Sequence, residues 1–583
     1  MSEKVRLALA SHGVEPTPNS PGDSRVDRLL DINRIRAKLL GKHGPHATSR
    51  LRKMVLKRQG GLDAVRERTA WQPVTVSLRR LFPLASFVGC GDIRVSQATD
   101  QSGRCVGGGV FAAVRGTRED GLEYVEEALS SGVAALLVPH PVSKAMVPQC
   151  VVPDVRAAYA RLCQALAGDP ATRLKLTGVT GTNGKTTIAW MLRSIWQAAG
   201  IPSGLLGTIE YDDGGHTQRA ELTTPASETL ASWLAAMVAR GTTHAALELS
   251  SHALDQDRAA GVALESVVLT NLTQDHFDYH GDLANYSAAK AAILDLCSPG
   301  GTVVFNADDP GIVSLVDNWR SAVEQEHTIC SFGVETDADV TGQVIAESVA
   351  GTHVLLTCRG NGAEPDRQIE LRTRLVGRHN LLNCLAAACV AVQQGIDSSA
   401  ISTGIENLGW VPGRLELVEC DQPFDVFVDY AHTEDALRRC LAALRRVVVG
   451  RLICVFGAGG DRDQLKRPLL GAAVADTADV CIVTNDNPRN EDPQKILEAV
   501  ADGVTQGGGI PLVVQDREKA IEKAVAIAEP GDGILVAGKG HESHQEIGGR
   551  LLRFDDREVV RATLHGMSDS MQLGVDRDGG VTK

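Results

Sequence analysis

The sequence lacks paired cysteines and long apolar runs, and each absence excludes a class of protein. Its 13 cysteines lie singly between Cys90 and Cys481, without any C-x-x-C pair, which argues against a zinc ribbon and against a disulfide framework. We therefore predict reduced thiols. No signal-peptide-like apolar segment follows the start, and no run approaches the roughly 18 apolar residues that a membrane span requires. We expect a soluble, cytoplasmic protein with no membrane partner.

The sequence also lacks a net positive charge. Its formal charge is -13 and its pI is near 5.7, which argues against bulk binding of nucleic acid. The first 70 residues differ, because they hold 15 Lys and Arg against 7 Asp and Glu, which leaves about -21 on the remainder. We interpret this segment as an appended, solvated helical or disordered extension. Partner or nucleic-acid binding is the alternative.

The length of 583 residues exceeds what one hydrophobic core usually supports, so several domains are expected. Apolar strands alternate with helical stretches, which predicts an α/β protein with mostly parallel sheets covered on both faces. Ligands then bind beyond the carboxyl ends of the strands. The predicted parts are a basic extension (1–75), a small α/β domain (76–172), a central domain (173–411), a third α/β domain (412–565) and a tail (566–583).

A glycine-rich turn stands between a predicted strand at 174–179 and a predicted helix at 186–199. It departs slightly from the G-x-x-x-x-G-K-[ST] template, because Gly178 lies one residue too early. Its backbone N–H groups and the helix N-terminus suit phosphate oxygens, Lys185 supplies a positive charge, and Thr186 can meet Mg²⁺. A plain strand-to-helix turn is the alternative. The predicted nucleotide-binding residues are Gly181, Thr182, Asn183, Gly184, Lys185, Thr186 and Thr187.

Two later strand ends carry candidate metal ligands. Glu248 lies at the end of the predicted strand at 245–249, and His276 follows that at 267–270. Mg²⁺ prefers oxygen ligands, which favours Glu248, while each residue taken alone is equally consistent with a hydrogen-bonded structural role. The segment from His541 to His544 looks metal-like, but its histidines are three residues apart rather than four, so we discard a zinc-hydrolase site.

Several motifs in order together resemble the Mur ligase family over about residues 76–565. They are Gly-Thr-Asn-Gly-Lys-Thr-Thr at 181–187, Glu-Leu-Ser-Ser-His-Ala-Leu at 248–254, Thr-Asn-Leu-Thr-Gln-Asp-His-Phe-Asp-Tyr-His-Gly at 270–281, Tyr-Ser-Ala-Ala-Lys at 286–290, Asn380 with Asn383, Ala386 and Ala387, Gly-Arg-Leu-Glu at 413–416 and Asp-Tyr-Ala-His-Thr at 429–433. Independent motifs at family spacing are more specific than any one of them.

The resemblance implies a three-domain fold. A UDP-recognition domain precedes a central P-loop-type ATPase domain, and a Rossmann-like domain follows and binds the amino acid. It also implies an ATP-dependent ligase of cell-wall synthesis that forms an amide bond through an acyl phosphate and releases ADP and phosphate. Positioning and charge neutralisation drive such phosphoryl transfer. We expect ATP and Mg²⁺ as cofactors and a monomeric enzyme.

The resemblance further implies residue roles. Catalysis is expected from Lys185, Lys290 and His276. Lys290 matches a lysine that is carbamylated in this family and helps to hold a second Mg²⁺, whereas the residues alone suggest an ordinary solvated lysine. Because carbamylation needs a neutral amine, we expect burial or nearby positive charge to lower its pKa. The implied Mg²⁺ ligands or their near neighbours are Thr186, Glu248, His276 and Lys290. The implied nucleotide contacts include Asn380, Asn383, Arg414 and His432.

The UDP-linked substrate is expected to contact Thr117, Arg118, Glu119, Thr223, Thr224, Ser250, Gln256 and Arg258. The chain departs from the family in the first domain, where Gly103 stands at the place of a serine that contacts the uridine diphosphate, unless Ser102 shifts to replace it. It departs again at Glu434, where the family usually has proline. That change should affect the stiffness of the loop more than the chemistry.

The added amino acid is indicated by Asp-Asn-Pro-Arg at 486–489, which resembles the branch of the family that adds meso-diaminopimelate to UDP-N-acetylmuramoyl-L-Ala-D-Glu. A guanidinium at Arg489 suits the distal carboxylate of that amino acid, which lysine lacks. A simple turn is the alternative for this segment. The expected pocket comprises Arg462, Asp486, Asn487, Pro488, Arg489, Gly538 and Glu542. An L-lysine-adding ligase, a folylpolyglutamate synthetase and a non-catalytic nucleotide-sugar-binding protein remain alternative hypotheses.

Overall fold

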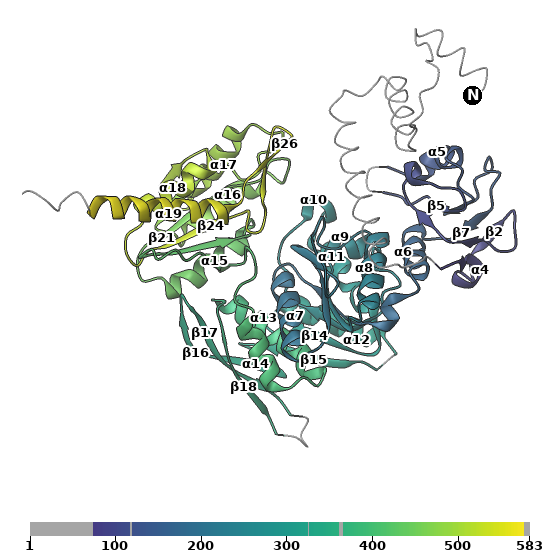
Figure 1. The fold of residues 1–583 in the computed structure, drawn as a ribbon, viewed down its shortest axis with the longest axis horizontal. Helices are drawn as coiled ribbons and strands as arrows, with labels where there is room; N and C mark the ends of the chain where they lie inside the picture. The colour runs from purple at the N-terminus through teal and green to yellow at the C-terminus, as the bar shows by residue number, and fades with distance from the viewer. Residues whose placement is uncertain (1–73, 117–118, 325, 361–364, 576–583) are drawn as a thin grey trace, which may run out of the picture. The chain divides into compact units, whose positions relative to one another are not determined.

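The computed structural model describes residues 74–116, 119–324, 326–360 and 365–575, with side chains described to residue 566 (Figure 1). Almost all of the predicted basic extension lies outside the described residues. The described part holds three larger sheets, each of them mostly parallel, as the alternation of apolar strands and helices predicts.

The first sheet has five strands in the order β2-β7-β6-β5-β4. Only the β2–β7 pair is antiparallel. The bounds are Ser86–Val88 for β2, Ala98–Thr99 for β4, Val110–Ala112 for β5, Ala135–Val138 for β6 and Gln149–Val151 for β7. A short ribbon of β1 (Val76–Ser77) and β3 (Arg94–Val95) and the helices α4 (Leu78–Leu81), α5 (Val125–Ser130) and α6 (Val155–Leu166) complete this part.

Helix α6 illustrates how the sequence builds these elements. The carboxylate of Asp154 caps its first turn by accepting a hydrogen bond from the N–H of Ala157, which is the usual role of an acidic residue at that position. Val155, Tyr159 and Leu162 recur at helical spacing and are buried in the core of this part. The apolar stripe therefore fixes which face of α6 packs inward.

The central sheet has eleven strands in the order β11-β10-β9-β12-β8-β13-β14-β15-β16-β17-β18. From β9 to β16 neighbouring strands are parallel, and the pairs at both edges are antiparallel. The bounds are Lys175–Thr180 (β8), Ser203–Leu206 (β9), Glu210–Asp212 (β10), Thr217–Arg219 (β11), His244–Glu248 (β12), Leu264–Leu269 (β13), Cys297–Asn306 (β14), Thr328–Gly333 (β15), Val340–Ser348 (β16), Gly351–Cys358 (β17) and Arg367–Thr373 (β18).

Helices cover this sheet, and α7, α13 and α14 pack against one another beside it (Figure 1). Their core includes Trp196 of α7 and the nearly continuous buried run of α13, whose small apolar side chains suit a helix enclosed on most sides. The helices are α7 (Lys185–Ala198), α8 (Ser227–Ala239), α9 (Ser251–Asp255), α10 (Phe277–His280), α11 (Leu283–Ala291), α12 (Pro310–Ala322), α13 (Arg378–Gln393) and α14 (Ser398–Asn407).

The third sheet has six strands in the order β19-β20-β24-β21-β22-β23, and only the β19–β20 pair is antiparallel. Its strands are β19 (Glu416–Leu417), β20 (Asp425–Asp429), β21 (Leu452–Phe456), β22 (Val480–Val483), β23 (Pro511–Val513) and β24 (Gly533–Ala537). The helices are α15 (Glu434–Val447), α16 (Lys466–Ala475), α17 (Pro493–Gln506), α18 (Arg517–Ile527) and α19 (Asp556–Val575), and β25 (His544–Ile547) forms a hairpin with β26 (Arg550–Arg553).

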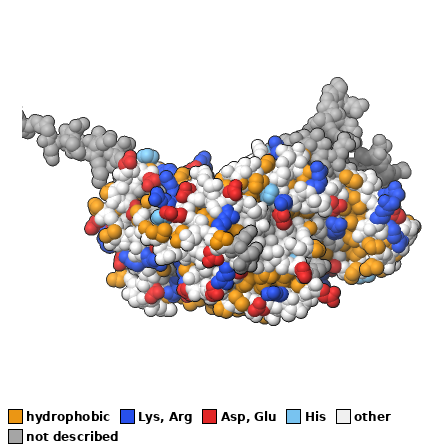
Figure 2. Space-filling model, turned by 90° about the horizontal axis from the view of Figure 1, so that it is seen from below, with side chains coloured by type: hydrophobic (Ala, Val, Ile, Leu, Met, Phe, Trp, Pro, Cys, Tyr) orange, Lys and Arg blue, Asp and Glu red, His pale blue; other side chains and the backbone are white. Residues whose placement is uncertain are grey.

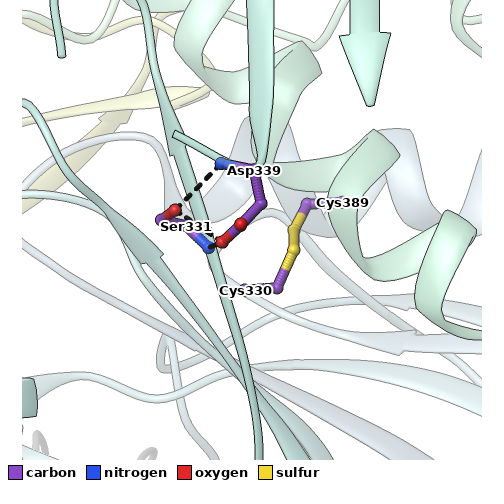
Figure 3. Close-up of a disulfide and its surroundings, with 4 residues drawn as sticks. All are labelled: Cys330, Ser331, Asp339 and Cys389. Atoms are coloured by element: carbon purple, nitrogen blue, oxygen red, sulfur yellow. Dashed lines mark hydrogen bonds between the residues drawn. A yellow bond between two sulfur atoms is a disulfide. The ribbon is translucent and has the colours of Figure 1, made fainter. Parts of the chain in front are cut away.

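The cysteines depart from expectation at one place. Cys330 of β15 and Cys389 of α13 form a disulfide. It lies next to the hydrogen bonds between Ser331 and Asp339 (Figure 3). The prediction of reduced thiols throughout is therefore wrong for this pair, which is brought together only when α13 packs on the sheet. The other eleven cysteines are free thiols.

The surface of the described part carries charges of both signs. Figure 2 shows Lys and Arg side chains interspersed with Asp and Glu on the face that it presents. Among the described residues, no helix combines the length and the apolarity that crossing a bilayer requires.

Candidate functional site

Three neighbouring strands of the central sheet place the glycine-rich turn at residues 181–187, called the phosphate loop below, between candidate polar groups. Strand β8 lies between β12 and β13, and its carboxyl end leads into residues 181–184 and then α7. Because β12 ends at Glu248 and β13 is followed by Thr270 and Asn271, these side chains flank the loop. The parallel sheet thus gathers at one edge groups that are 60 or more residues apart in the chain.

Two glycines in the loop are required by its shape. Gly181 has φ +144° and Gly184 has φ +91°, values that side chains rarely adopt. A Cβ atom at Gly181 would collide with the Thr270 side chain, and one at Gly184 would collide with the Asn383 carboxamide. Between them, the N–H of Asn183 donates to Oδ1 of Asn271 at 2.9 Å. The loop is therefore held against the neighbouring strand end in one conformation.

Lys185 closes the loop on itself. Its Nζ donates to the carbonyl oxygens of Gly181 at 2.8 Å and Thr182 at 2.9 Å, and burial lowers the pKa of its amine, partly offset by Glu248. An ammonium held by the backbone of a glycine-rich loop at a helix N-terminus is suited to phosphate oxygens.

Glu248 is the centre of a buried hydrogen-bond cluster. Its Oε2 accepts from the hydroxyls of Thr186 at 2.9 Å and Thr208 at 2.8 Å, and its Oε1 accepts from the N–H of Thr208 at 2.8 Å. Only 1% of the residue is exposed. A carboxylate and two hydroxyls form an oxygen donor set of the kind that Mg²⁺ prefers, so the residues present fit that ion. Thr187 lies one position farther along α7, also buried.

Lys290 is buried on α11, with 1% of it exposed. Its Nζ donates to the carbonyl of Gly181 at 2.7 Å and lies 4.5 Å from the centre of the Tyr286 ring. Burial, with a further contribution from Lys185, lowers the pKa of Lys290 well below the usual range of lysine. The alternative of an ordinary solvated lysine is therefore wrong, and the lowered pKa favours the neutral amine that reaction with CO₂ requires.

His276 stands at the mouth of the same region with φ +55°. Its Nε2 lies 3.4 Å from Oδ2 of Asp275, and its ring meets that of His252 edge to face at 4.7 Å. Burial lowers the pKa of His276 to about 4, although Asp275 opposes the shift. The imidazole is therefore neutral near pH 7, the form that can donate an electron pair to a metal ion.

The predicted nucleotide contacts and the phosphate loop line one cavity of about 260 Å³. Arg414 spans its two sides, since its Nη2 donates to the Thr186 hydroxyl at 3.2 Å while its guanidinium lies 4.9 Å from the centre of the Tyr430 ring. Among the predicted site residues, the cavity is lined by Thr182, Asn183, Gly184, Lys185, Thr186, Thr187, Thr223, Ser250, His276, Lys290, Asn380, Asn383, Arg414 and His432.

Four of the residues predicted to hold the UDP-linked substrate form a connected group. Ser250 donates its N–H to the Thr224 hydroxyl at 3.0 Å, and Arg258 donates to the Thr224 carbonyl at 3.1 Å and to Gln256 Oε1 at 2.8 Å. Thr223 joins the Glu248 cluster through the Thr208 hydroxyl at 3.2 Å. Hydrogen bonds through Thr208 and Glu248 thus link Thr223 to Thr186 of the phosphate loop.

The residues predicted to contact the uridine lie in the part of the chain that contains the first, five-stranded sheet. Thr117 and Arg118 lie outside the described residues, and Glu119 accepts a hydrogen bond from the N–H of Gly116 through its carbonyl at 2.8 Å. The Ser102 hydroxyl donates to Glu127 at 2.9 Å. A Cβ on Gly103 would meet no atom within 4 Å, so a side chain there has room.

The residues predicted to bind the amino acid follow three neighbouring strands of the third sheet. Gly538 comes after β24, Arg462 after β21 and the 486–489 segment after β22, and these strands are adjacent in that order. Asn487 Nδ2 donates to Glu542 Oε2 at 2.9 Å. Arg462 is exposed. The parallel topology therefore brings these separate motifs to one edge.

Arg489 is held by its surroundings. Its Nη1 donates to the Gly460 carbonyl at 2.5 Å, and its Nε lies 3.7 Å from Glu546 Oε2. Asp486 is 7% exposed, and its Oδ2 lacks a hydrogen-bond donor among the described residues. Gly538 allows this carboxylate to approach, because a Cβ at that position would collide with it.

Some residues of the site escaped the sequence analysis. Thr208 carries no motif, and only the fold shows that it shares Glu248 with Thr186. Asp435 accepts from Asn183 Nδ2 at 3.1 Å and from the Thr273 hydroxyl at 3.3 Å, a contact that spans the central and third sheets. Lys539 lies between Gly538 and Glu542, which were both predicted to belong to the amino-acid pocket, and the sequence does not show that its side chain is fully buried.

Comparison with known proteins identifies two domains of one family. Residues 179–391 match the Mur ligase middle domain, and residues 413–540 match the domain described as Mur ligase, glutamate ligase domain. The chain is 41% identical over 476 residues to the UDP-N-acetylmuramoyl-L-alanyl-D-glutamate–2,6-diaminopimelate ligase of Gloeobacter violaceus, which covers 81% of this chain and 94% of that relative. It is 40% identical over 478 residues to the enzyme of the same name from Synechocystis, with 81% and 92% covered.

Solved structures of proteins from the same family also resemble this chain. A structure of a UDP-N-acetylmuramoyl-L-alanyl-D-glutamate–2,6-diaminopimelate ligase matches with a TM-score of 0.62 and 30% identity, covering 85% of this chain and all of that one. The folylpolyglutamate synthase of Mycobacterium tuberculosis matches with a TM-score of 0.55 and 20% identity over 66% of this chain and 92% of its own, a likeness of fold alone. On the family domains and on relatives aligned along nearly their whole length, the chain belongs to the Mur ligase family, with its three-domain α/β fold and its amide-bond-forming ligase activity.

Proposed function

We propose that this ligase uses ATP to add meso-diaminopimelate to UDP-N-acetylmuramoyl-L-Ala-D-Glu in the synthesis of peptidoglycan precursors. The observation that carries the choice of amino acid is the meeting of Arg489, Asp486 and Glu542 at one sheet edge. A guanidinium together with two carboxylates suits an amino acid that carries both a distal carboxylate and a distal ammonium. The relatives whose names state this substrate support the proposal.

The proposed reaction has two steps. A carboxylate oxygen of the dipeptide attacks the γ-phosphorus of ATP, which forms an acyl phosphate and releases ADP. The amine of the incoming amino acid then attacks the acyl carbon, the C–O bond to phosphate breaks, and the amine loses a proton as the amide forms. Lys185 and the loop N–H groups are placed to neutralise charge on the phosphates, which is the main demand of phosphoryl transfer.

Mg²⁺ would be held near Thr186 and Glu248, with His276 and a carbamylated Lys290 as the further candidate ligands. Such an ion neutralises phosphate charge and polarises the transferred group. The oxygen donors around Glu248 and the burial of Lys290 support this assignment. Asn380, Asn383, Arg414 and His432 line the same cavity and are proposed to contact the nucleotide.

Each of the three larger sheets is assigned to a different substrate. We assign residues 76–172 to recognition of the UDP end, 173–411 to ATP and the acyl phosphate, and 412–565 to the incoming amino acid. Each range contains one of the three larger sheets. The dipeptide is expected to run along Thr223, Thr224, Ser250, Gln256 and Arg258, which connect to the phosphate loop through Thr208 and Glu248.

The decisive experiment measures phosphate release with ATP, Mg²⁺ and the UDP-linked dipeptide, together with either meso-diaminopimelate or L-lysine. We expect kcat/KM for L-lysine to be lower by roughly a hundredfold or more, because Arg489 would face no carboxylate. Equal use of both amino acids would contradict the assignment of the pocket and favour the lysine-adding alternative. No turnover with either would contradict an active ligase and favour a non-catalytic nucleotide-sugar-binding protein.

A further inference from the structure

Lys539 is a fully buried lysine in the loop that follows β24. Its side chain has 0% exposure, although lysine is almost never found so deep unless its charge is paired. The residue lies between Gly538 and Glu542, both of which belong to the proposed amino-acid pocket.

The ammonium of Lys539 forms one corner of a closed triangle of hydrogen bonds. Its Nζ donates to Asn487 Oδ1 at 3.0 Å and to Glu542 Oε2 at 3.0 Å. The third side runs from Asn487 Nδ2 to the same Glu542 oxygen at 2.9 Å. A charge-assisted donor to the amide oxygen fixes which way the Asn487 carboxamide faces.

The triangle extends to Arg489 through the β25 strand. The N–H of Glu546 donates to Asn487 Oδ1 at 3.0 Å, and the N–H of Arg489 donates to the Glu546 carbonyl at 2.9 Å. Arg489 also has φ +55°, a conformation that a non-glycine residue keeps only when its surroundings hold it. The orientation of Asn487 is therefore coupled to the backbone that aims Arg489.

We infer that Lys539 is a positioning residue for the amino-acid substrate: it orients Asn487 and occupies one oxygen of Glu542, so that the other oxygen is directed to the substrate ammonium. The inference rests on the proposed function of this pocket. Among the described residues, no hydrogen bond engages Glu542 Oε1, and 23% of the Glu542 side chain is exposed. One oxygen is thus committed to the protein, and the other is available to a ligand.

The charge on Glu542 depends on the same contact. Burial by itself would raise the pKa of Glu542, but Lys539 and the hydrogen bond from Asn487 outweigh it and lower the pKa. The other charged or titratable groups that interact with Glu542 are Tyr430, Arg517, His541 and His544. Removing Lys539 should therefore move the acidic limb of the pH profile for diaminopimelate use to higher pH, because Glu542 would take up a proton sooner.

The test replaces Lys539 with methionine, which keeps the length of the side chain and removes its charge. The control is Lys523→Met, at an exposed position of α18. For Lys539→Met we expect the KM for meso-diaminopimelate to rise roughly tenfold, with the KM for ATP within about twofold of the parent. The acidic limb of kcat/KM for diaminopimelate should move to higher pH. Lys523→Met should leave all three quantities unchanged.

Two results would overturn the inference while leaving the proposed function intact: an unchanged KM for diaminopimelate, or equal losses for ATP and diaminopimelate together with a lowered Tm. If Lys539→Met does not fold, Lys539→Gln retains a donor without the charge and should show the same selective rise in KM, smaller in size. Failure of both variants to fold would assign Lys539 a structural role and contradict the inference. A parent enzyme that releases no phosphate with diaminopimelate would instead refute the proposed function.

Discussion

At the residue scale, the site is built from charged and polar side chains that the fold has removed from water. Three hydrogen-bond donors surround the buried Glu248 side chain, whereas Lys290 has only one carbonyl and an aromatic face beside it. Burial of a charge is tolerated when partners replace the lost hydration, and otherwise it favours the neutral form. The Glu248 side chain thus has hydrogen-bond donors in place of water, whereas the poorly partnered Lys290 has a lowered pKa.

Lys290→Ala should lower phosphate release by roughly a hundredfold or more, because it removes the group proposed to become an anion next to the metal site. Acetate should restore part of the activity by placing a carboxylate in the vacated space, measured as a titration against chloride at equal ionic strength. Lys290→Arg should not be restored, since a permanent cation fills that space. Full activity of Lys290→Ala without acetate would contradict the role given to this lysine.

Two histidines outside the proposed metal site should make the fold sensitive to acid. Burial lowers the pKa of His379 to about 4 and that of His541 to about 3, while an unfolded chain has a histidine pKa near 6.5. Below about pH 6.5 the unfolded state therefore binds more protons, so stability is full above that pH and falls as pH drops toward about 4. Thermal melts across this range should show Tm falling, with a shallower fall for His379→Gln. Parallel curves for both proteins would exclude His379 as a cause.

At the element scale, strand order explains the site better than any helix does. The β12-β8-β13 order sets Glu248 and Asn271 on either side of the phosphate loop, and the β24-β21-β22 order gathers the amino-acid motifs. Helix α15 matters at its first turn, where Thr433 caps the helix by accepting from the N–H of Ala436 and Asp435 reaches Asn183. Acidic residues at the helix N-terminus and Arg445 and Arg446 in its last turn both suit the helix dipole.

Glu434→Pro should raise Tm, by the equivalent of up to about 1 kcal/mol, and leave catalysis unchanged. Glu434 is the first residue of α15, where the N–H has no acceptor within the helix. Thr433 has φ -119° and ψ 155°, which is the conformation that a residue before proline prefers. The lost pair with Arg438 joins two half-exposed side chains and contributes little. Glu434→Ala, which removes that pair without fixing φ, is the control, and a drop in Tm for the proline variant alone would contradict this account.

At the scale of the whole molecule, the family match accounts for most of the chain but not for all of it. The Gloeobacter relative aligns along 94% of its own length and yet with only 81% of this chain. The basic segment at residues 1–70, whose charge of about +8 contrasts with the rest, precedes both matched family domains.

Deletion of residues 1–70 should leave kcat and the KM values for all three substrates within about twofold of the full chain, since a domain with its own core retains its function without an appended segment. Steady-state phosphate release by the two forms at the same salt concentration measures this. A rise in KM of about tenfold or more for any substrate would show that the basic segment takes part in catalysis.

The sequence by itself determined the chemistry that local motifs encode. The loop at 181–187 needed glycine where φ is positive, and the apolar strands with polar ends predicted the parallel sheets that the structure has. These features are local, because the conformation of a turn and the period of a strand depend on neighbouring residues. The family resemblance rested on such local runs as well, which is why it survived the departures at Gly103 and Glu434.

Only the tertiary structure decided which distant side chains share an environment. No spacing predicted that Thr208 would donate to Glu248 or that Lys539 would join Asn487 to Glu542. Nor did the scattered cysteines indicate that Cys330 and Cys389 would pair. Burial and pKa depend on everything packed around a group, and that packing is set by strand order and helix docking across the chain rather than by its immediate neighbours.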